Sequence, residues 1–370
     1  MTNLSKTAPA PAPTSSRPSG SRLLRMLARK GTPTNVFVAV ILIAAGIWAS
    51  SAGPFVSLIG QSCAIFAIAA LGQSILVGGA GQIAFSGGAF MALGAFTGGL
   101  LARAGVTNFF VIIIASLVVG AVVGLIAGLP GLRFRGLYLL LSSIALQFIV
   151  NSLTQNYQNA VDQPGFVLPP LIIGSVDFSS GTPLYLLLVV VLLLVYAGIA
   201  AVERTGVGLA WKALRESEVA AAMTGVDVVR WKLYAFAASG AVTGMAGALF
   251  AYWVGRADAA SYGLDLTISI VTMLYIGGIR SRLGAILGAV IITALPYFLQ
   301  SQVSSWLNNA GINFSFYLNN QSEIDAALFS LLFLLVVLFE PGGIMSLLGK
   351  LESWLRGLGR ARSTRKRDDA

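Results

Sequence analysis

Histidine is absent from this chain of 370 residues, and cysteine occurs once, as Cys63. The lack of histidine excludes a histidine-ligated metal site, a histidine-based catalytic triad and a histidine proton relay. A single cysteine excludes an internal disulfide framework, and its place in an apolar run favours a small buried residue over a reactive thiol. The phosphate-binding loop G-x-x-x-x-G-K-[ST] is also missing. We therefore expect no catalytic residue, no metal site and no ATP hydrolysis in this chain.

Charge is scarce as well. Aspartate, glutamate, lysine and arginine make up 10% of the residues, against about a quarter in an ordinary globular domain. Hydrophobic residues make up 56%, and the mean hydropathy is +0.82. Such a chain cannot cover a water-facing surface. No stretch alternates like a strand of a membrane barrel, so helices are expected to cross the bilayer. The predicted fold class is an all-α integral membrane protein.

Ten apolar segments come close to the ~20 residues that span a bilayer. They are residues 35–52, 54–77, 83–102, 107–129, 136–154, 183–202, 232–254, 265–279, 283–300 and 325–340. Two of them, 265–279 and 325–340, are short, which indicates tilted or broken helices. The transmembrane domain is expected to cover residues 35–347, with a basic cytoplasmic tail over 348–370.

The first 34 residues are rich in proline, serine and basic residues, which predicts a disordered basic arm at 1–34 in the cytoplasm. A cleaved signal peptide, with its apolar part at Val36–Trp48, is the alternative. The distribution of charge supports the ten spans. With both termini in the cytoplasm, every lysine and arginine except Arg103 and Arg256 falls on the cytoplasmic side. The loops Gln155–Pro183 and Ser301–Ile324 hold no basic residue and face outward, either toward a partner or as plain connections.

Charged residues are nearly absent from the interior of the spans, although carriers coupled to protons or sodium generally need one there. The polar residues present are uncharged, and Gln147 and Asn151 share a helix face with Ser143. Non-helical backbone at membrane depth must be buried in protein or line a cavity. The glycines at 78–81 and 87–88 therefore predict a break in the third span beside a translocation path. The candidate path residues are Gln82, Ser86, Gly87, Gly88, Ser143, Gln147 and Asn151. Hydrogen bonding between helices is the alternative for each polar side chain.

The largest cytoplasmic loop covers residues 203–232 and holds a predicted helix from Trp211 to Met223, ended by Gly225. Asp227 is expected to cap the next span. A polar helix between two spans is more than a connection requires. It either docks into a soluble partner or lies on the membrane surface.

Three stretches carry a resemblance to a known family. The first holds Gly81-Gln82, Ala89-Phe90 and Gly94-Ala95-Phe96, and the second is "LRFRGLYLLLSSIALQFIV". The third begins "GLAWKALRESEVAAAMTGVDVVRWK" and includes Arg215-Glu216, Ala220-Ala221, Gly225 and Lys232. Later segments, "LYIGGIRSRLGAILGAVIITALP" and "LFEPGGI", also fit. Over residues 55–347 the chain resembles the permease subunits of branched-chain amino acid ABC importers, of the M-type (LivM-like).

The resemblance implies a helical bundle that forms half of a pore with a sister H-type permease, in the bacterial inner membrane. Two ATP-binding subunits would bind ATP and magnesium, so this chain would hold no cofactor, and a solute-binding protein would dock outside. The residues implied in coupling to the ATPase are Lys212, Arg215, Glu216, Glu218 and Gly225. No nucleic acid is implied as a partner.

The sequence departs from the family pattern at two places. Gly87-Gly88 stands where the family usually has Gly-His, and Gln147 lies near a position that is often acidic. These departures leave the solute open among branched-chain amino acids, urea, short amides and aromatic acids. An ATP-independent facilitator channel is the alternative function, since it would share the glycines and the polar residues but would not need the helix in the loop. A membrane enzyme is disfavoured, because no cluster of carboxylates lies at a bilayer interface.

Overall fold

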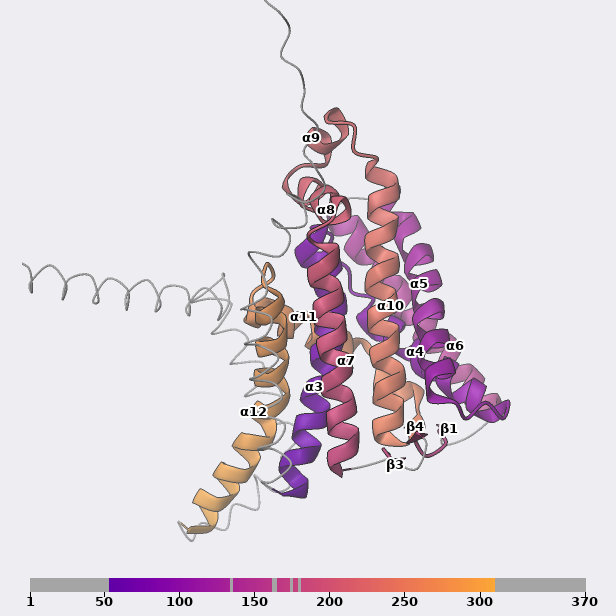
Figure 1. The fold of residues 1–370 in the computed structure, drawn as a ribbon, viewed down its shortest axis with the longest axis vertical. Helices are drawn as coiled ribbons and strands as arrows, with labels where there is room; N and C mark the ends of the chain where they lie inside the picture. The colour runs from indigo at the N-terminus through magenta and orange to yellow at the C-terminus, as the bar shows by residue number, and fades with distance from the viewer. Residues whose placement is uncertain (1–52, 134–135, 162–164, 174–175, 179–180, 310–370) are drawn as a thin grey trace, which may run out of the picture. The chain divides into compact units, whose positions relative to one another are not determined.

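The computed structural model describes residues 53–133, 136–161, 165–173, 176–178 and 181–309. The predicted arm at 1–34, the first and tenth predicted spans and the tail at 348–370 lie outside these residues. The described part is mainly helical (Figure 1).

The second to ninth predicted spans each correspond to a helix. These helices are α3 (Pro54–Ser74), α4 (Gly87–Arg103), α5 (Phe109–Arg133), α6 (Leu137–Val161), α7 (Gly181–Val202), α10 (Val228–Val254), α11 (Leu264–Gly277) and α12 (Arg282–Asn309). By length and composition, α5, α6, α7, α10 and the continuous segment Phe55–Gly79 can each cross a membrane. Helix α11 is short, as predicted, with 14 residues. Helices α6 and α12 continue beyond their predicted ends at 154 and 300.

Short strands connect the loops at one end of the bundle. Strand β1 (Phe166–Val167) pairs antiparallel with β4 (Arg256–Ala257), and β2 (Ile172–Ile173) pairs antiparallel with β3 (Val176–Asp177). A 3₁₀-helix, η2 (Ala259–Tyr262), leads into α11. The pairing of β1 with β4 joins the segment after α6 to the segment after α10. Figure 1 shows these strands at the end of the bundle opposite to α8 and α9.

Helix α10 is the central helix, packed against α3, α4 and α5. Glycines permit this packing: a Cβ added at Gly94 in α4 would clash with the carbonyl of Gly244 in α10, and one at Gly120 in α5 would clash with the carbonyl of Gly240. Lipid supplies no hydrophobic drive for helices to associate, so close backbone contact takes its place. Gly94, Gly120, Gly240 and Gly244 are thus positions where these helices pack backbone against backbone.

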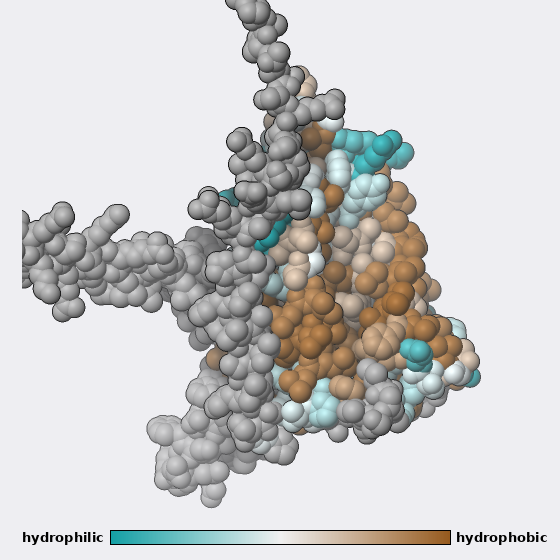
Figure 2. Space-filling model, in the orientation of Figure 1, coloured by the Kyte–Doolittle hydropathy of each residue, from teal (hydrophilic) through white to brown (hydrophobic). Residues whose placement is uncertain are grey.

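The outer helices present apolar side chains to the surroundings. In the most apolar 18-residue stretch of α5, and likewise of α6, only 28% is buried inside the structure. The corresponding share in α10 is 67%. Ile114 of α5 and Leu194 of α7 are more than 60% exposed. Figure 2 shows hydrophobic surface over the middle of this face, with hydrophilic residues near its two ends. This is the pattern of a surface whose middle contacts lipid.

The loop at 203–232 differs from the prediction of one helix over Trp211–Met223. It forms two helices, α8 (Gly206–Glu216) and α9 (Glu218–Met223), separated by Ser217 in an extended conformation. The Ser217 side chain accepts a hydrogen bond from Ala220 N and so caps α9. Serine is among the residues that best satisfy the free amides at a helix start, and here this preference ends the preceding helix. Gly225 (φ +84°) follows α9, and Asp227 caps α10, as predicted.

The glycine-rich stretch is non-helical only before α4, so the predicted break lies at the start of the third span. Gly87 and Gly88, predicted to be part of it, are instead the first residues of α4. Helix α3 continues as one π-helical turn, η1 (Ile75–Gly79), and the chain is then non-helical until α4 begins at Gly87. We call residues 80–86 the connecting segment. Gly81 has φ +70°, a backbone conformation that residues other than glycine rarely adopt. The connecting segment alternates between buried and more exposed residues.

Candidate coupling and translocation site

Helix α8 lies directly on the glycine-rich turn that precedes the connecting segment. Arg215 Nη1 of α8 donates a hydrogen bond to the carbonyl oxygen of Gly78, at 2.8 Å. A Cβ added at Gly81 would lie 2.8 Å from Arg215 Cγ, and one at Gly78 would clash with the carbonyl of Ile279. Glycine at 78 and 81 therefore lets the glycine-rich stretch approach both α8 and the turn between α11 and α12 without an intervening side chain.

Helix α9 contacts the connecting segment through Glu218. Gln82 Nε2 donates to Glu218 Oε1 at 3.1 Å, and Lys232 Nζ forms an ion pair with the same oxygen at 2.6 Å. Lys232 belongs to α10 and is 2% exposed, and its Nζ also donates to the carbonyl of Gly131 in α5. A buried ion pair needs further hydrogen bonds to offset the desolvation of its charges. Together these contacts tie α9 to the connecting segment and to two membrane helices.

The amides at the start of α4 are bound by side chains of α6 and α11. Phe85 N donates to Ser143 Oγ at 2.8 Å, Gly88 N donates to Thr267 Oγ1 at 2.8 Å, and Ala89 N donates to Gln147 Oε1. The first amides of a helix have no partner within the helix, so these side chains supply acceptors that water cannot supply in a buried site.

Gln147 connects the start of α4 to two further segments. Its Nε2 donates to the carbonyl of Tyr262 at 2.8 Å, and its Oε1 also accepts from Thr267 Oγ1 at 3.0 Å. A Cβ at Gly88 would lie 2.6 Å from Thr267 Oγ1 and 3.0 Å from Gln147 Nε2. Gly88 therefore has no space for a side chain in this arrangement.

The predicted path residues separate into three positions. Ser143, Gln147, Gly87 and Gly88 lie together, buried, where α4 begins. Gln82 lies at the contact with α9, beside a cavity of about 310 Å³ that Glu218 and α6 also line. Asn151 lies further along α6 and is half-buried. Within the described residues, Asn151 Oδ1 and Ser86 Oγ are buried without a hydrogen-bond partner. Contact of any of these residues with a solute stays a prediction.

The predicted coupling residues fall into two groups. Arg215 and Glu218 turn toward the bundle through the contacts above. Lys212 and Glu216 are exposed, and Glu216 pairs with Arg215 at 3.2 Å. A Cβ at Gly225 would meet no atom within 4 Å, so its positive φ is the reason for glycine there.

Sequence reasoning missed Lys232 and Gly131 as parts of this site, and Thr267 as a cap of α4. Their roles depend on which helices meet, and no spacing in the sequence shows that. Among the residues that the structure describes, no group of three or more histidine, cysteine, aspartate or glutamate residues is arranged to hold a metal ion. Cys63 is buried and free, in line with its predicted role as a packing residue.

Comparison with known proteins identifies the family. The family described as "Branched-chain amino acid transport system / permease component" matches residues 55–339. The chain is 29% identical over 282 residues to the high-affinity branched-chain amino acid transport permease LivM of Salmonella typhimurium, and 28% identical over the same length to LivM of Escherichia coli. Each alignment covers 70% of this chain and 66% of the relative.

A third relative is the probable branched-chain amino acid transport permease LivH of Methanocaldococcus jannaschii, 29% identical over 198 residues, or 50% of this chain and 62% of that one. No solved structure matches. The family match covers the helical bundle and the loop with α8 and α9. The chain is a multi-pass membrane protein that belongs to the family of permease components of branched-chain amino acid transport systems.

Proposed function

We propose that this chain is the M-type permease subunit of an ATP-driven ABC importer in the bacterial inner membrane, with ten spans and both termini in the cytoplasm. The observation that carries the proposal is the contact of α8 and α9 with the connecting segment, in a chain whose family serves transport systems. A helix pair that only linked two spans would not need a buried ion pair and backbone hydrogen bonds to the bundle.

The proposed partners are a sister H-type permease, two ATP-binding subunits and a solute-binding protein. The ATP-binding subunits would carry ATP and magnesium and would dock on α8 and α9. The outer surface of these helices supports this docking, because it carries exposed apolar side chains. These are Leu209 (66% exposed), Val219 (64%) and Met223 (85%). The solute-binding protein would dock at the opposite end, where β1 to β4 lie.

The contacts suggest how the closing of the ATP-binding subunits would reach the bundle. A shift of α8 and α9 would displace Arg215 and Glu218, which hold Gly78 and Gln82. The connecting segment leads into α4, whose first amides are held by Gln147 and Thr267. A ligand-driven change requires contacts that differ between two states. The hydrogen bonds to the start of α4 are the contacts proposed to change.

The proposed solute is a branched-chain or other hydrophobic amino acid, or a related small polar solute. The two curated LivM relatives are named for branched-chain amino acid transport. The proposed path follows the face of α6 that carries Ser143, Gln147 and Asn151. Its side chains are uncharged, which suits a solute without net charge.

The experiment compares uptake by the assembled complex in proteoliposomes for the wild type, Arg215→Ala and Arg230→Ala. Arg215→Ala removes the charge-assisted hydrogen bond to Gly78, so ATP-driven uptake is expected to fall by about tenfold or more, while ATP hydrolysis continues. Arg230 lies at the same end of the bundle and its side chain is 76% exposed, so Arg230→Ala is the matched control and should transport normally. Uptake of equal rate without the ATP-binding subunits would contradict the proposal and establish the facilitator channel instead.

A further inference from the structure

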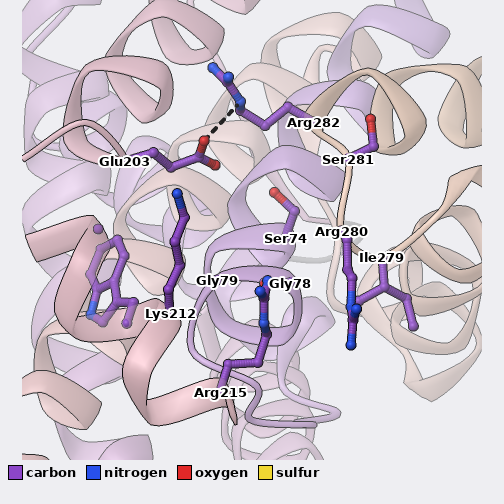
Figure 3. Close-up of a pocket in the computed structure, with 12 residues that line it drawn as sticks. Ser74, Gly78, Gly79, Glu203, Lys212, Arg215, Ile279, Arg280, Ser281 and Arg282 are labelled. Carbon is purple, nitrogen blue, oxygen red and sulfur yellow. Dashed lines mark hydrogen bonds and ion pairs between the residues drawn. The ribbon is translucent and has the colours of Figure 1, made fainter. Parts of the chain in front are cut away.

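A second hollow lies beside the coupling contacts, and four basic side chains are among the residues that line it (Figure 3). It has a volume of about 240 Å³. Its walls are formed by Glu203, the residue after α7, and by the face of α8 with Lys212 and Arg215. Arg280, in the turn between α11 and α12, and Arg282, the first residue of α12, complete them. We call it the basic cavity. Four cationic side chains and one carboxylate line it, so it carries an excess of positive charge.

The one carboxylate does not neutralise the four cations. Glu203 Oε2 pairs with Arg282 Nε at 3.2 Å, and Figure 3 shows Lys212 extending toward the same carboxylate. Arg215 is held by Gly78 and by Glu216. Among the described residues, Lys212 and Arg280 have neither a hydrogen bond nor an ion pair, and both are exposed.

Two guanidinium nitrogens of residues that line the basic cavity lack an acceptor. Arg215 Nε and Arg282 Nη1 are buried, and neither has a hydrogen-bond partner among the residues that the structure describes. A buried donor without an acceptor is costly, and more so when it belongs to a charged group. An anion in the cavity would supply the negative charge that the four cations lack.

The place of the basic cavity indicates which anion it meets. Helix α7 ends at Val202, next to Glu203, and α12 begins at Arg282. The cavity therefore lies where two membrane helices reach the polar boundary of the bilayer, the depth of lipid headgroups. Basic pockets between membrane helices at this depth bind anionic headgroups. Guanidinium groups also match phosphate oxygens with two parallel hydrogen bonds.

We propose that the basic cavity binds a phosphate group, contributed by an anionic phospholipid headgroup or by free phosphate. The site is separate from the proposed solute path and does not depend on the solute. Arg282 and Arg215, whose side chains are about a quarter exposed, provide positive charge in the walls, while Lys212 and Arg280 provide exposed charge.

The test measures binding to the full chain purified with its co-assembled subunits, so that its result is independent of transport. The probes are vesicles of phosphatidylglycerol, vesicles of phosphatidylcholine, and inorganic phosphate. The variant combines Lys212→Gln with Arg280→Gln, both at exposed positions. Arg230→Gln is the control, since it removes one exposed charge at the same end of the bundle. Size-exclusion chromatography verifies that each variant assembles.

The double variant is expected to bind the phosphate group about 30-fold more weakly, from the usual contribution of a basic residue near an anionic surface. Arg230→Gln should bind within about twofold of the wild type. Weaker binding of phosphatidylglycerol vesicles alone assigns a lipid headgroup, and weaker binding of inorganic phosphate assigns free phosphate.

Equal binding of every probe by the double variant and the wild type would overturn the proposal. If the double variant also lost the ATP-binding subunits, the same result would assign the basic cavity to acidic side chains of a protein partner.

Discussion

At the scale of single residues, Gln147 connects four elements of the candidate site. Its amide accepts from Ala89 N and Thr267 Oγ1 and donates to the Tyr262 carbonyl, so it joins α6 to α4, α11 and η2. It is 1% exposed. A polar side chain in this position stabilises the bundle through satisfied hydrogen bonds, whether or not a solute passes beside it.

Replacing Gln147 with leucine should therefore destabilise the chain. The Ala89 amide and the Tyr262 carbonyl would lose their partner in a buried site, at a cost of about 1–3 kcal/mol for each group. The midpoint of thermal unfolding in detergent should fall clearly. Phe148→Leu, at a neighbouring position that is 56% exposed, is the control and should change it little. An unchanged midpoint for Gln147→Leu would show that these hydrogen bonds do not form.

At the scale of elements, α9 has only six residues and depends on its contacts. Glu218→Gln would leave the Lys232 ammonium buried without its counter-charge, and loss of one partner from a buried pair is strongly destabilising. Hydrogen exchange of the α9 amides should become faster by on the order of tenfold or more. Glu216→Gln is the control, because the side chain of Glu216 is 69% exposed. Equal exchange in both variants would refute the role of Glu218 as the anchor of α9.

A second prediction at this scale concerns the contact between α4 and α10. Gly94→Ala places a Cβ against the backbone of Gly244, and overpacking of this kind costs about 1–3 kcal/mol. A Cβ at Gly198 in α7 meets nothing within 4 Å, so Gly198→Ala should be neutral or slightly stabilising. Thermal unfolding in detergent measures both variants. If they unfolded at the same temperature, close approach of α4 and α10 would not be the reason for glycine at 94.

At the scale of the whole molecule, the described helices leave two ends of the bundle with different properties. One end carries α8, α9 and the basic cavity, and the other carries the short strands (Figure 1). The described basic residues are concentrated at the first end, and the proposed orientation puts this end in the cytoplasm by the charge asymmetry of membrane proteins. The proposed orientation is therefore open to a direct measurement.

Cysteine labelling of the chain expressed without other subunits would test this orientation. Cys63 is buried, so the native chain should not react with a membrane-impermeant maleimide. Val167→Cys, at a position that is 74% exposed beside β4, should react in intact cells. Val219→Cys, at a position that is 64% exposed on α9, should react only after the membrane is opened. Reaction of both cysteines from the same side would contradict the proposed topology.

The sequence by itself determined that this protein lies in a membrane and where most of its helices form. Scarce charge and long apolar segments are local properties, so the membrane environment, the helical class and the helices at the second to ninth predicted spans could be predicted. The capping of α10 by Asp227 and the end of α9 at Gly225 could also be predicted, because they depend on one residue and its neighbours. Ser217 is also a local signal, because serine favours the start of a helix. The strong helix formers on either side of it nevertheless favour one continuous helix, so the sequence does not predict the break there.

Only the tertiary structure decided what the polar residues touch. Gln82, Ser143 and Gln147 look alike in the sequence as candidates for one path. In the structure, Gln82 meets Glu218 of α9, while Ser143 and Gln147 hold the start of α4. The ion pair of Lys232 and the basic cavity likewise join residues far apart in the chain. Their partners depend on which helices approach one another, and that is set by packing across the whole bundle.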